Sequence, residues 1–280
     1  MGSTPGVSTI LAGPYGNSAL LEAMTRAALE AGELALRYFR VGEKTSASIQ
    51  YKDGGSPVSE ADLAVDQLLK LRLEPLLPEA GWLSEETADN SVRLEKHQVF
   101  IVDPIDGTRA FINGDVRWGI SLALVEAGRP VLGVLQMPAL AQTFAAAEGW
   151  GATMNGTTIT PSRHPELKGA RFAGPSKAMD GLDKQGFAIV REPRVPSLAY
   201  RLARIALGDL DAAVASTSAW DWDIAAAHLL IRESGGCLTD LDKQEPSYNA
   251  AEPRYKALTA AAPQLHGELV EAIRKIAAAN

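Results

Sequence analysis

The chain has 280 residues, of which 46% are apolar and 22% are charged. That composition can bury a full hydrophobic core, which excludes a disordered tail and a collagen-like rod. Its 27 basic and 34 acidic residues give a net charge of −7. Because contacts to a phosphate backbone need a positive surface, this balance argues against duplex nucleic acid as a partner. A small phosphorylated ligand stays compatible with it, since a bound metal ion can reverse the local charge.

The chain carries one cysteine, Cys237, so it has no internal disulfide, and the count favours a reducing cytoplasm. No basic residue precedes Arg26, so the chain does not begin like a secretory signal peptide. No apolar run reaches the roughly 20 residues that a bilayer requires. We therefore expect a soluble cytoplasmic protein that makes no contact with a membrane.

The first third of the chain predicts two helices and a strand. Residues 1–17 are rich in Gly, Ser, Thr and Pro, and we expect a flexible leader there. Apolar residues at three- and four-residue steps predict an amphipathic helix from residue 18 to near residue 39. A short strand is expected over 45–51, and a loop over 52–57. A second helix is expected from Ser59, because the sequence that starts there has the form of a capping box.

The rest of the chain alternates strands and helices. A short apolar run that stops at Asp103 predicts a buried strand. Two further runs separated by a glycine turn predict a hairpin, and Asn155-Gly156 predicts a tight turn. The expected elements are a strand over 99–102, a hairpin of 120–125 and 131–137, a helix over 198–207, a strand over 212–215, a helix over 224–234, a strand over 256–261 and a helix over 263–279.

Acidic residues gather in four short segments, three of which fall where a strand or loop meets a turn or a helix start. Side chains at such junctions can converge on one point. Taken singly, each has an ordinary structural interpretation, such as an N-cap for Asp223 or a helix-start charge for Asp62. Their order and context together favour a functional site. The segments are SPVSEADLAVD with Asp62, WLSEET with Glu85 and Glu86, DPIDGT with Asp103 and Asp106, and WDWDIAAA with Asp221 and Asp223.

The DPIDGT segment is the most informative of the four. Pro104 bars an ordinary continuation of the strand, and Gly107 permits an unusual φ. Thr108 can open a short helix whose first N–H groups would bind an anion. Carboxylates beside an anion site need a cation, and oxygen ligands suit Mg²⁺. The segment therefore predicts a metal that bridges protein carboxylates and a phosphate.

The ordered set SPVSEAD, SEET, DPIDGTxxF and WDxAAA, with ESGG ten residues beyond its Asp, resembles the inositol monophosphatase superfamily of metal-dependent phosphatases. The resemblance covers roughly residues 18–275. It implies a layered α/β fold, the αβαβα sandwich of the inositol monophosphatase and fructose bisphosphatase type. It further implies an N-terminal α+β subdomain over 18–150 with most metal ligands, and a C-terminal α/β subdomain over 151–280 with Asp223 and the substrate pocket.

The resemblance also implies the roles of single residues. Asp62 and Thr108 match the pair that orients and deprotonates the attacking water, and Glu85 completes the catalytic set. The backbone of Gly107 and Thr108 matches the phosphate cradle. The matching metal ligands are Glu85, Asp103, the carbonyl of Ile105, Asp106 and Asp223, and the tentative substrate contacts are Lys52, Arg109, Ser216 and Trp222.

The cofactor implied is Mg²⁺, with two or three ions per site, and lithium would inhibit by replacing one of them. Hydroxide would attack phosphorus in line, and no covalent phosphoenzyme is needed. Relatives are often homodimers, so the resemblance implies the same here. The expected partner is a small phosphorylated metabolite.

The substrate is less well determined by the motifs. Arg109 and the Phe-Ile that follow Thr108 are similar to bacterial 3'(2'),5'-bisphosphate nucleotidases, whereas inositol enzymes usually read DGTTNF. Inositol enzymes often carry a Glu where this chain has Ser216. Histidinol-phosphate phosphatases also carry a basic residue after DGT. The leading substrate is thus 3'-phosphoadenosine 5'-phosphate, followed by inositol-1-phosphate and histidinol phosphate.

Two alternatives stay open at this stage. Arg109 is either a surface residue or a contact for a second phosphate, which an arginine binds through two parallel hydrogen bonds. The chain could also be a catalytically silent relative with a regulatory role, because a fold does not fix a function.

Overall fold

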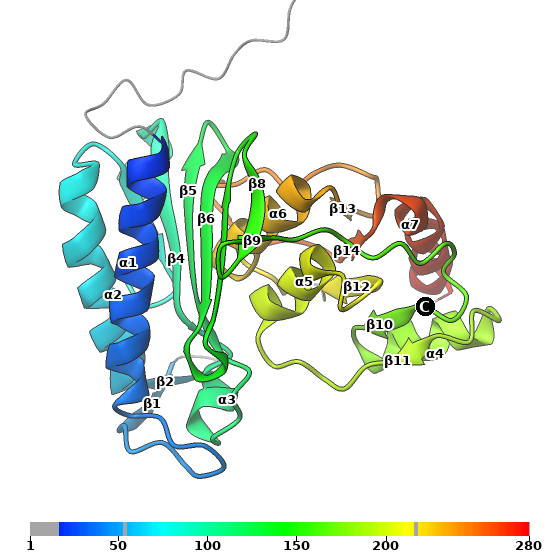
Figure 1. The fold of residues 1–280 in the computed structure, drawn as a ribbon, viewed down its shortest axis with the longest axis horizontal. Helices are drawn as coiled ribbons and strands as arrows, with labels where there is room; N and C mark the ends of the chain where they lie inside the picture. The colour runs from blue at the N-terminus through cyan, green and yellow to red at the C-terminus, as the bar shows by residue number, and fades with distance from the viewer. Residues whose placement is uncertain (1–16, 53–54, 216–217, 280) are drawn as a thin grey trace, which may run out of the picture.

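The computed structural model describes residues 17–52, 55–215 and 218–279. Helices and sheets alternate as an αβαβα sandwich, which confirms the expected α/β class (Figure 1). Helices α1 (Asn17–Leu36) and α2 (Glu60–Leu73) form one outer layer. Helices α5 (Leu198–Leu207) and α6 (Asp221–Ser234) lie between the two sheets, and α4 (Ser176–Lys184) and α7 (Pro263–Ala278) form the other outer layer.

The first sheet has seven strands in chain order, and only its first pair, β3 and β4, is parallel. Strands β4 to β9 follow one another as antiparallel neighbours. The strands are β3 (Gly81–Ser84), β4 (Gln98–Asp106), β5 (Gly119–Glu126), β6 (Arg129–Met137), β7 (Gln142–Ala147), β8 (Gly151–Met154) and β9 (Thr157–Thr158).

The second sheet has five strands in the order β11-β10-β12-β14-β13. Strand β12 pairs in parallel with β10 and antiparallel with β14. A separate two-stranded sheet of β1 (Ile49–Tyr51) and β2 (Pro57–Ser59) leads into α2. The strands of the larger sheet are β10 (Arg171–Ala173), β11 (Val190–Arg191), β12 (Ala212–Ala215), β13 (Cys237–Asp240) and β14 (Leu258–Ala261).

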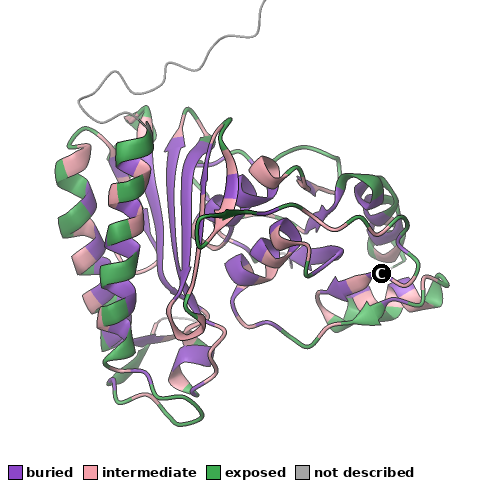
Figure 2. Ribbon diagram, in the orientation of Figure 1, coloured by how far each residue is buried: buried purple, intermediate pink, exposed green. Residues whose placement is uncertain are grey.

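Both sheets are covered on both faces, so their central strands are mostly apolar and buried (Figure 2). On β4, Phe100 and Val102 pack with α1 and α2, whereas Val99 and Ile101 pack with α5 and α6. Successive side chains of a strand point to opposite faces, so this one strand contributes to two hydrophobic cores. The central helices thus pack between the sheets, and the strand ends beside them can carry a site.

Most of the expected elements are confirmed. The helix over 198–207, the strand over 212–215, the hairpin and the Asn155-Gly156 turn all form. Short 3₁₀ helices connect several elements: η1 (Glu74–Leu76), η2 (Ser91–Glu95) and η3 (Pro138–Leu140). The expected leader lies almost wholly outside the described residues. None of the helices within the described ranges is long and apolar enough to span a lipid bilayer.

Several boundaries differ from expectation. The strands expected over 45–51 and 256–261 are shorter, at Ile49–Tyr51 and Leu258–Ala261, and two further differences lie beside the acidic residues. Strand β4 does not stop at Asp103 but runs to Asp106, because a register shift between these two residues accommodates Pro104 in the ladder with β5. Helix α6 begins at Asp221, three residues before the expected Ile224, with Trp220 as its N-cap. The N-cap interpretation of Asp223, which was the ordinary alternative to a metal ligand, is therefore wrong.

Candidate active site

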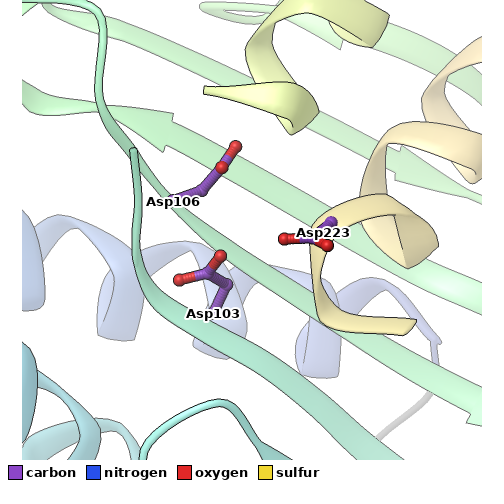
Figure 3. Close-up of side chains that lie close together, drawn as sticks. All are labelled: Asp103, Asp106 and Asp223. Atoms are coloured by element: carbon purple, nitrogen blue, oxygen red, sulfur yellow. The ribbon is translucent and has the colours of Figure 1, made fainter. Parts of the chain in front are cut away.

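Three buried or half-buried aspartates from two elements converge between the sheets. Asp103 and Asp106 lie at the end of β4, and Asp223 lies in the first turn of α6 (Figure 3). One carboxylate oxygen of each lies within 4.8 Å of the others. The register shift in β4 turns both of its aspartates toward α6, which an unbroken strand would not do, because residues three apart face opposite sides. We call Asp103, Asp106 and Asp223 the acid cluster.

The first turn of α5 holds Asp106. Its Oδ2 accepts hydrogen bonds from Ser197 Oγ at 2.5 Å and from the N–H of Ala199 at 2.7 Å, and its Oδ1 accepts one from the N–H of Leu198 at 3.1 Å. Ser197 is also the N-cap of α5, where its Oγ accepts from the N–H of Tyr200. The helix start therefore fixes the orientation of this carboxylate.

The other two aspartates accept local backbone hydrogen bonds. Oδ2 of Asp223 accepts from the N–H of Trp220 at 2.7 Å, and Oδ1 of Asp103 accepts from the N–H of Ile105 at 3.1 Å. Each of these two carboxylates thus keeps one oxygen without such a bond. Within the described parts of the chain, no lysine or arginine donates to any member of the acid cluster.

Glu85 lies beside the cluster and pairs with the predicted loop lysine. Nζ of Lys52 lies 3.1 Å from Glu85 Oε1, 3.2 Å from the Glu85 carbonyl oxygen and 2.8 Å from Glu86 Oε1. Burial lowers the pKa of Lys52, but the charges of Glu85 and Glu86 more than offset this and raise it. Burial raises the pKa of Glu86 to about 7, despite the bond from Lys52. The structure thus places Lys52 and Glu85 together, as expected.

Asp62 and Thr108 also meet, as expected. Thr108 Oγ1 lies 3.3 Å from Asp62 Oδ1 and 3.1 Å from the carbonyl oxygen of Ile105. Oδ2 of Asp62 accepts from both the N–H and the hydroxyl of Ser59, which completes the predicted capping box of α2. Burial raises the pKa of Asp62 to about 6, although these hydrogen bonds lower it. A carboxylate with that pKa can accept a proton at neutral pH.

The acid cluster is electrostatically unfavourable without a cation. Burial and the neighbouring carboxylates raise the pKa values of Asp103 and Asp223 well above their ordinary range. Burial raises the pKa of Asp106 to about 6, against the hydrogen bonds from α5. Buried carboxylates that repel one another need a positive charge to stay ionised. The donors are all oxygens, which is the set that a hard divalent cation such as Mg²⁺ prefers, so these residues fit a metal site.

The backbone at position 107 requires a glycine. Its φ is +93°, in the left-handed region, and it is the N-cap of the short helix α3 (Thr108–Ile112). A Cβ at this position would lie 3.3 Å from the N atom of Ser197 and 3.4 Å from the carbonyl oxygen of Arg117. The predicted phosphate cradle is therefore packed directly against the start of α5.

The tentative substrate contacts have different surroundings. Arg109 is exposed on α3, and its side chain makes no hydrogen bond or ion pair within the described residues. Trp222 is half-buried and stacks on Trp220, with ring centroids 5.0 Å apart and an interplanar angle of 6°. Ser216 lies outside the described residues. A substrate role for these three residues stays a prediction.

Sequence reasoning gave no role to three residues that the structure places at the site. Ser197 could have been found as the polar residue before the predicted helix at 198. Glu86 was visible only as the neighbour of Glu85. Asp66 follows Asp62 by one helical turn and binds the segment that carries Glu85.

Comparisons with known proteins identify the architecture. The chain superposes on the IMPase of Thermotoga maritima with a TM-score of 0.80 and 26% identity, over 92% of this chain and 98% of that one. The fold is thus that of an inositol monophosphatase-type sandwich, with the acid cluster between its two sheets.

The sequence comparisons identify the family. The model of the inositol monophosphatase family matches residues 17–278. The inositol-1-monophosphatase of Mesorhizobium japonicum is 32% identical over an alignment of 244 residues, and the match covers 80% of this chain and 86% of that protein. The 3'(2'),5'-bisphosphate nucleotidase CysQ of Aggregatibacter actinomycetemcomitans is 30% identical over 247 residues, 83% of this chain and 88% of that protein. The chain therefore belongs to the inositol monophosphatase family and is a phosphatase of that superfamily. The two identities do not separate the two substrates.

Proposed function

We propose that this protein is a Mg²⁺-dependent phosphomonoesterase that hydrolyses 3'-phosphoadenosine 5'-phosphate to AMP. The observation that carries the reaction type is the acid cluster, whose enclosed carboxylates receive no hydrogen bond or ion pair from a lysine or arginine among the described residues. The observation that favours a bisphosphate is a cavity with two arginines beside α5, described below.

In the proposed mechanism, the ions would be held by Glu85, Asp103, Asp106, Asp223 and the Ile105 carbonyl. When bound, Mg²⁺ activates water and neutralises the charge of the phosphoryl group. Thr108 Oγ1 passes its proton to Asp62 as it accepts one from the attacking water. The N–H groups of Gly107 and Thr108 hold the phosphoryl oxygens in line with that water. As the bond between phosphorus and the ester oxygen breaks, the leaving oxygen takes a proton from solvent and Asp62 later returns its proton to solvent, so the products are inorganic phosphate and the alcohol.

The cavity has a volume of about 370 Å³ and is lined by the loop between β10 and α4, residues 192–195, and Arg201 of α5. In the sequence, Val195 and Arg201 flank the turn of residues 197–199 that binds Asp106. Arg201 donates to the carbonyl oxygens of Val195 and Val214. The carboxylate of Glu192, which also lines the cavity, pairs with Arg204 at 3.1 Å.

The pairing of Glu192 leaves Arg194 and Arg201 as the charged groups that can bind a second anion. Arginine suits a phosphate because its planar fork offers two parallel donors. A monophosphate of inositol offers no second phosphate to these two arginines. This difference supports the nucleotide over inositol-1-phosphate.

Inositol-1-phosphate is the second candidate, favoured by the inositol-1-monophosphatase relative at 32% identity. The test is to measure Mg²⁺-dependent phosphate release from 3'-phosphoadenosine 5'-phosphate, inositol-1-phosphate and histidinol phosphate, each with and without lithium. The proposal expects kcat/KM for the nucleotide to exceed the others by at least about 100-fold, or about 2.7 kcal/mol. A hundredfold preference for another substrate would replace the nucleotide. No release from any of them would favour the silent relative.

Charge removal at the cavity sharpens the substrate assignment. Arg201→Gln should raise KM for the nucleotide roughly 10- to 100-fold, the usual worth of a hydrogen bond to a charged group, and change KM for inositol-1-phosphate less than about threefold. Arg109→Ala is the matched variant, because the position of Arg109 after Asp106-Gly107-Thr108 suggests that it contacts the second phosphate instead. The arginine whose loss changes the ratio of the two KM values contacts the second phosphate. Equal effects of Arg201→Gln on both substrates would contradict its role.

We further propose a cytoplasmic homodimer. The family resemblance supports the dimer, and the single cysteine supports the reducing compartment. Light scattering after size-exclusion chromatography gives the mass directly, and a mass of about twice the chain's 29.7 kDa is expected.

A further inference from the structure

Asp66 is a buried carboxylate that the mechanism does not use. It lies on α2, one turn after Asp62, and 6% of its surface is exposed. Its Oδ1 accepts from Ser84 Oγ and its Oδ2 from Thr87 Oγ1, both at 2.5 Å. No lysine or arginine in the described residues pairs with it. Burying a charge without an ion-pair partner costs stability. The presence of a carboxylate here, held by two hydroxyl groups, therefore needs a structural reason.

These partners bracket Glu85. Ser84 ends β3, and Thr87 lies two residues beyond Glu85. Ser84 Oγ also accepts from the N–H of Glu86 at 3.2 Å. The N–H of Glu85 itself donates to the carbonyl oxygen of Val102 on β4. The segment 84–87 is thus tied at both ends to one carboxylate and in its middle to the strand that leads to Asp103.

The helix that carries Asp66 also carries Asp62. Residues four apart on a helix share a face, and here one face directs Asp62 to Thr108 and Asp66 to the Glu85 segment. A carboxylate can accept from both hydroxyls at once, which an amide cannot do without donating to one of them. The residue type therefore fits a clamp that takes two donors.

We propose that Asp66 is a positioning residue that fixes Glu85 for cation binding by clamping Ser84 and Thr87 to α2. The inference rests on the proposed metal site. It assigns Asp66 no contact with substrate or ion. Its effect is to set the distance between the proton acceptor Asp62 and the ligand Glu85 through a single rigid helix.

The test is cation binding and backbone exchange in Asp66→Asn. We expect Mn²⁺, measured by calorimetry, to bind at least tenfold more weakly, and the Mg²⁺ concentration for half-maximal activity to rise by the same factor. At saturating Mg²⁺, kcat should stay within about threefold of wild type. In the metal-free protein, amide exchange should accelerate over residues 84–87. Thr87→Val removes one of the two contacts and should give a smaller change in the same direction, so a poorly folded Asp66→Asn does not end the test.

Asp211→Asn is the matched control, because Asp211 is an equally buried carboxylate bound to Arg171, which is part of the other sheet. It should lower stability and leave Mn²⁺ affinity unchanged. Wild-type Mn²⁺ affinity and wild-type exchange in Asp66→Asn would overturn the clamp. An equal loss of affinity in both variants would do the same. Absence of cation binding by the wild-type protein would instead overturn the proposed function, and the exchange data would still decide whether the clamp exists.

Discussion

Asp103 and Asp211 are both aspartates with about 1% of their surface exposed, yet their pKa values move in opposite directions. Burial raises the pKa of Asp211, but Arg171, whose Nη2 lies 2.8 Å from its Oδ1, brings it below the ordinary value. Asp103 is buried beside other carboxylates, and both effects raise its pKa well above the ordinary value. Burial alone therefore does not decide the charge state of a carboxylate. Asp211 forms a direct ion pair with an arginine, whereas no lysine or arginine of the described residues forms one with the acid cluster.

The largest expected effects on activity and stability come from neutralising Asp103 in the acid cluster and Asp211 beside Arg171. Asp103→Asn should lower kcat by roughly 10³-fold, about 4 kcal/mol of transition-state stabilisation, without lowering the stability of the metal-free protein, because it relieves repulsion. Asp211→Asn should retain activity and lower the free energy of unfolding by about 1–3 kcal/mol, less than for a fully enclosed pair because Arg171 is partly exposed. Steady-state kinetics and urea unfolding measure both. A normal kcat for Asp103→Asn at saturating Mg²⁺ would end the comparison.

The next effect is on pH dependence. The pKa of Asp62 is raised to about 6, so its carboxyl is protonated, and unable to accept a proton, as the pH falls below that value. We expect kcat/KM at low Mg²⁺ to fall about tenfold per pH unit below about pH 6. A nearby cation favours the ionised form, so the limb should move to lower pH as Mg²⁺ rises.

The sign for stability is opposite to that for activity. The folded pKa of Asp62 exceeds its unfolded value, so below about pH 6 the folded state binds more protons than the unfolded state. The free energy of unfolding therefore falls as the pH rises toward about 6. Asp62→Asn should remove this contribution together with the acid limb of activity. A rate independent of pH between 5 and 8 in the wild type is the result that contradicts the assignment.

A smaller effect is expected at the backbone. Gly107→Ala places a Cβ against Ser197 at a φ of +93° and should lower stability by about 1–2 kcal/mol from the φ alone, with a further loss from the contact. Gly186→Ala has a similar φ of +87° and open space around it, so it isolates the first contribution. Thermal unfolding and kcat of both variants give the difference. Equal losses at the two glycines would show that the contact with α5 has no consequence.

The sequence predicted the elements with strong patterns and missed those whose reasons are tertiary. The two apolar runs around the glycine turn in 120–137 and the pattern in 198–207 predicted a hairpin and a helix that both form. Helix α4 was missed because Gly181 interrupts its pattern, and the structure shows why glycine is there: a Cβ would lie 2.5 Å from Ile276 of α7. No local pattern contains that contact.

The site shows the same division. Motif order predicted Asp62, Glu85, Asp103, Asp106 and Asp223, and the structure brings them to one region. The bonds from α5 to Asp106 span more than 90 residues, so spacing in the sequence could not reveal them. Asp66 stands in the same motif as Asp62 but was passed over, because its partners Ser84 and Thr87 lie in another segment.

The most direct test of the account is the thermal unfolding of metal-free wild type and Asp103→Asn at neutral pH, each with and without Mg²⁺. If the acid cluster is built to take a cation, Mg²⁺ at about 100 times its Kd should stabilise the wild type by about 2.7 kcal/mol, or roughly 5 °C in Tm. Asp103→Asn should show little of this shift. An equal shift in both proteins, or none in the wild type, would contradict the claim that these buried aspartates form the cation site.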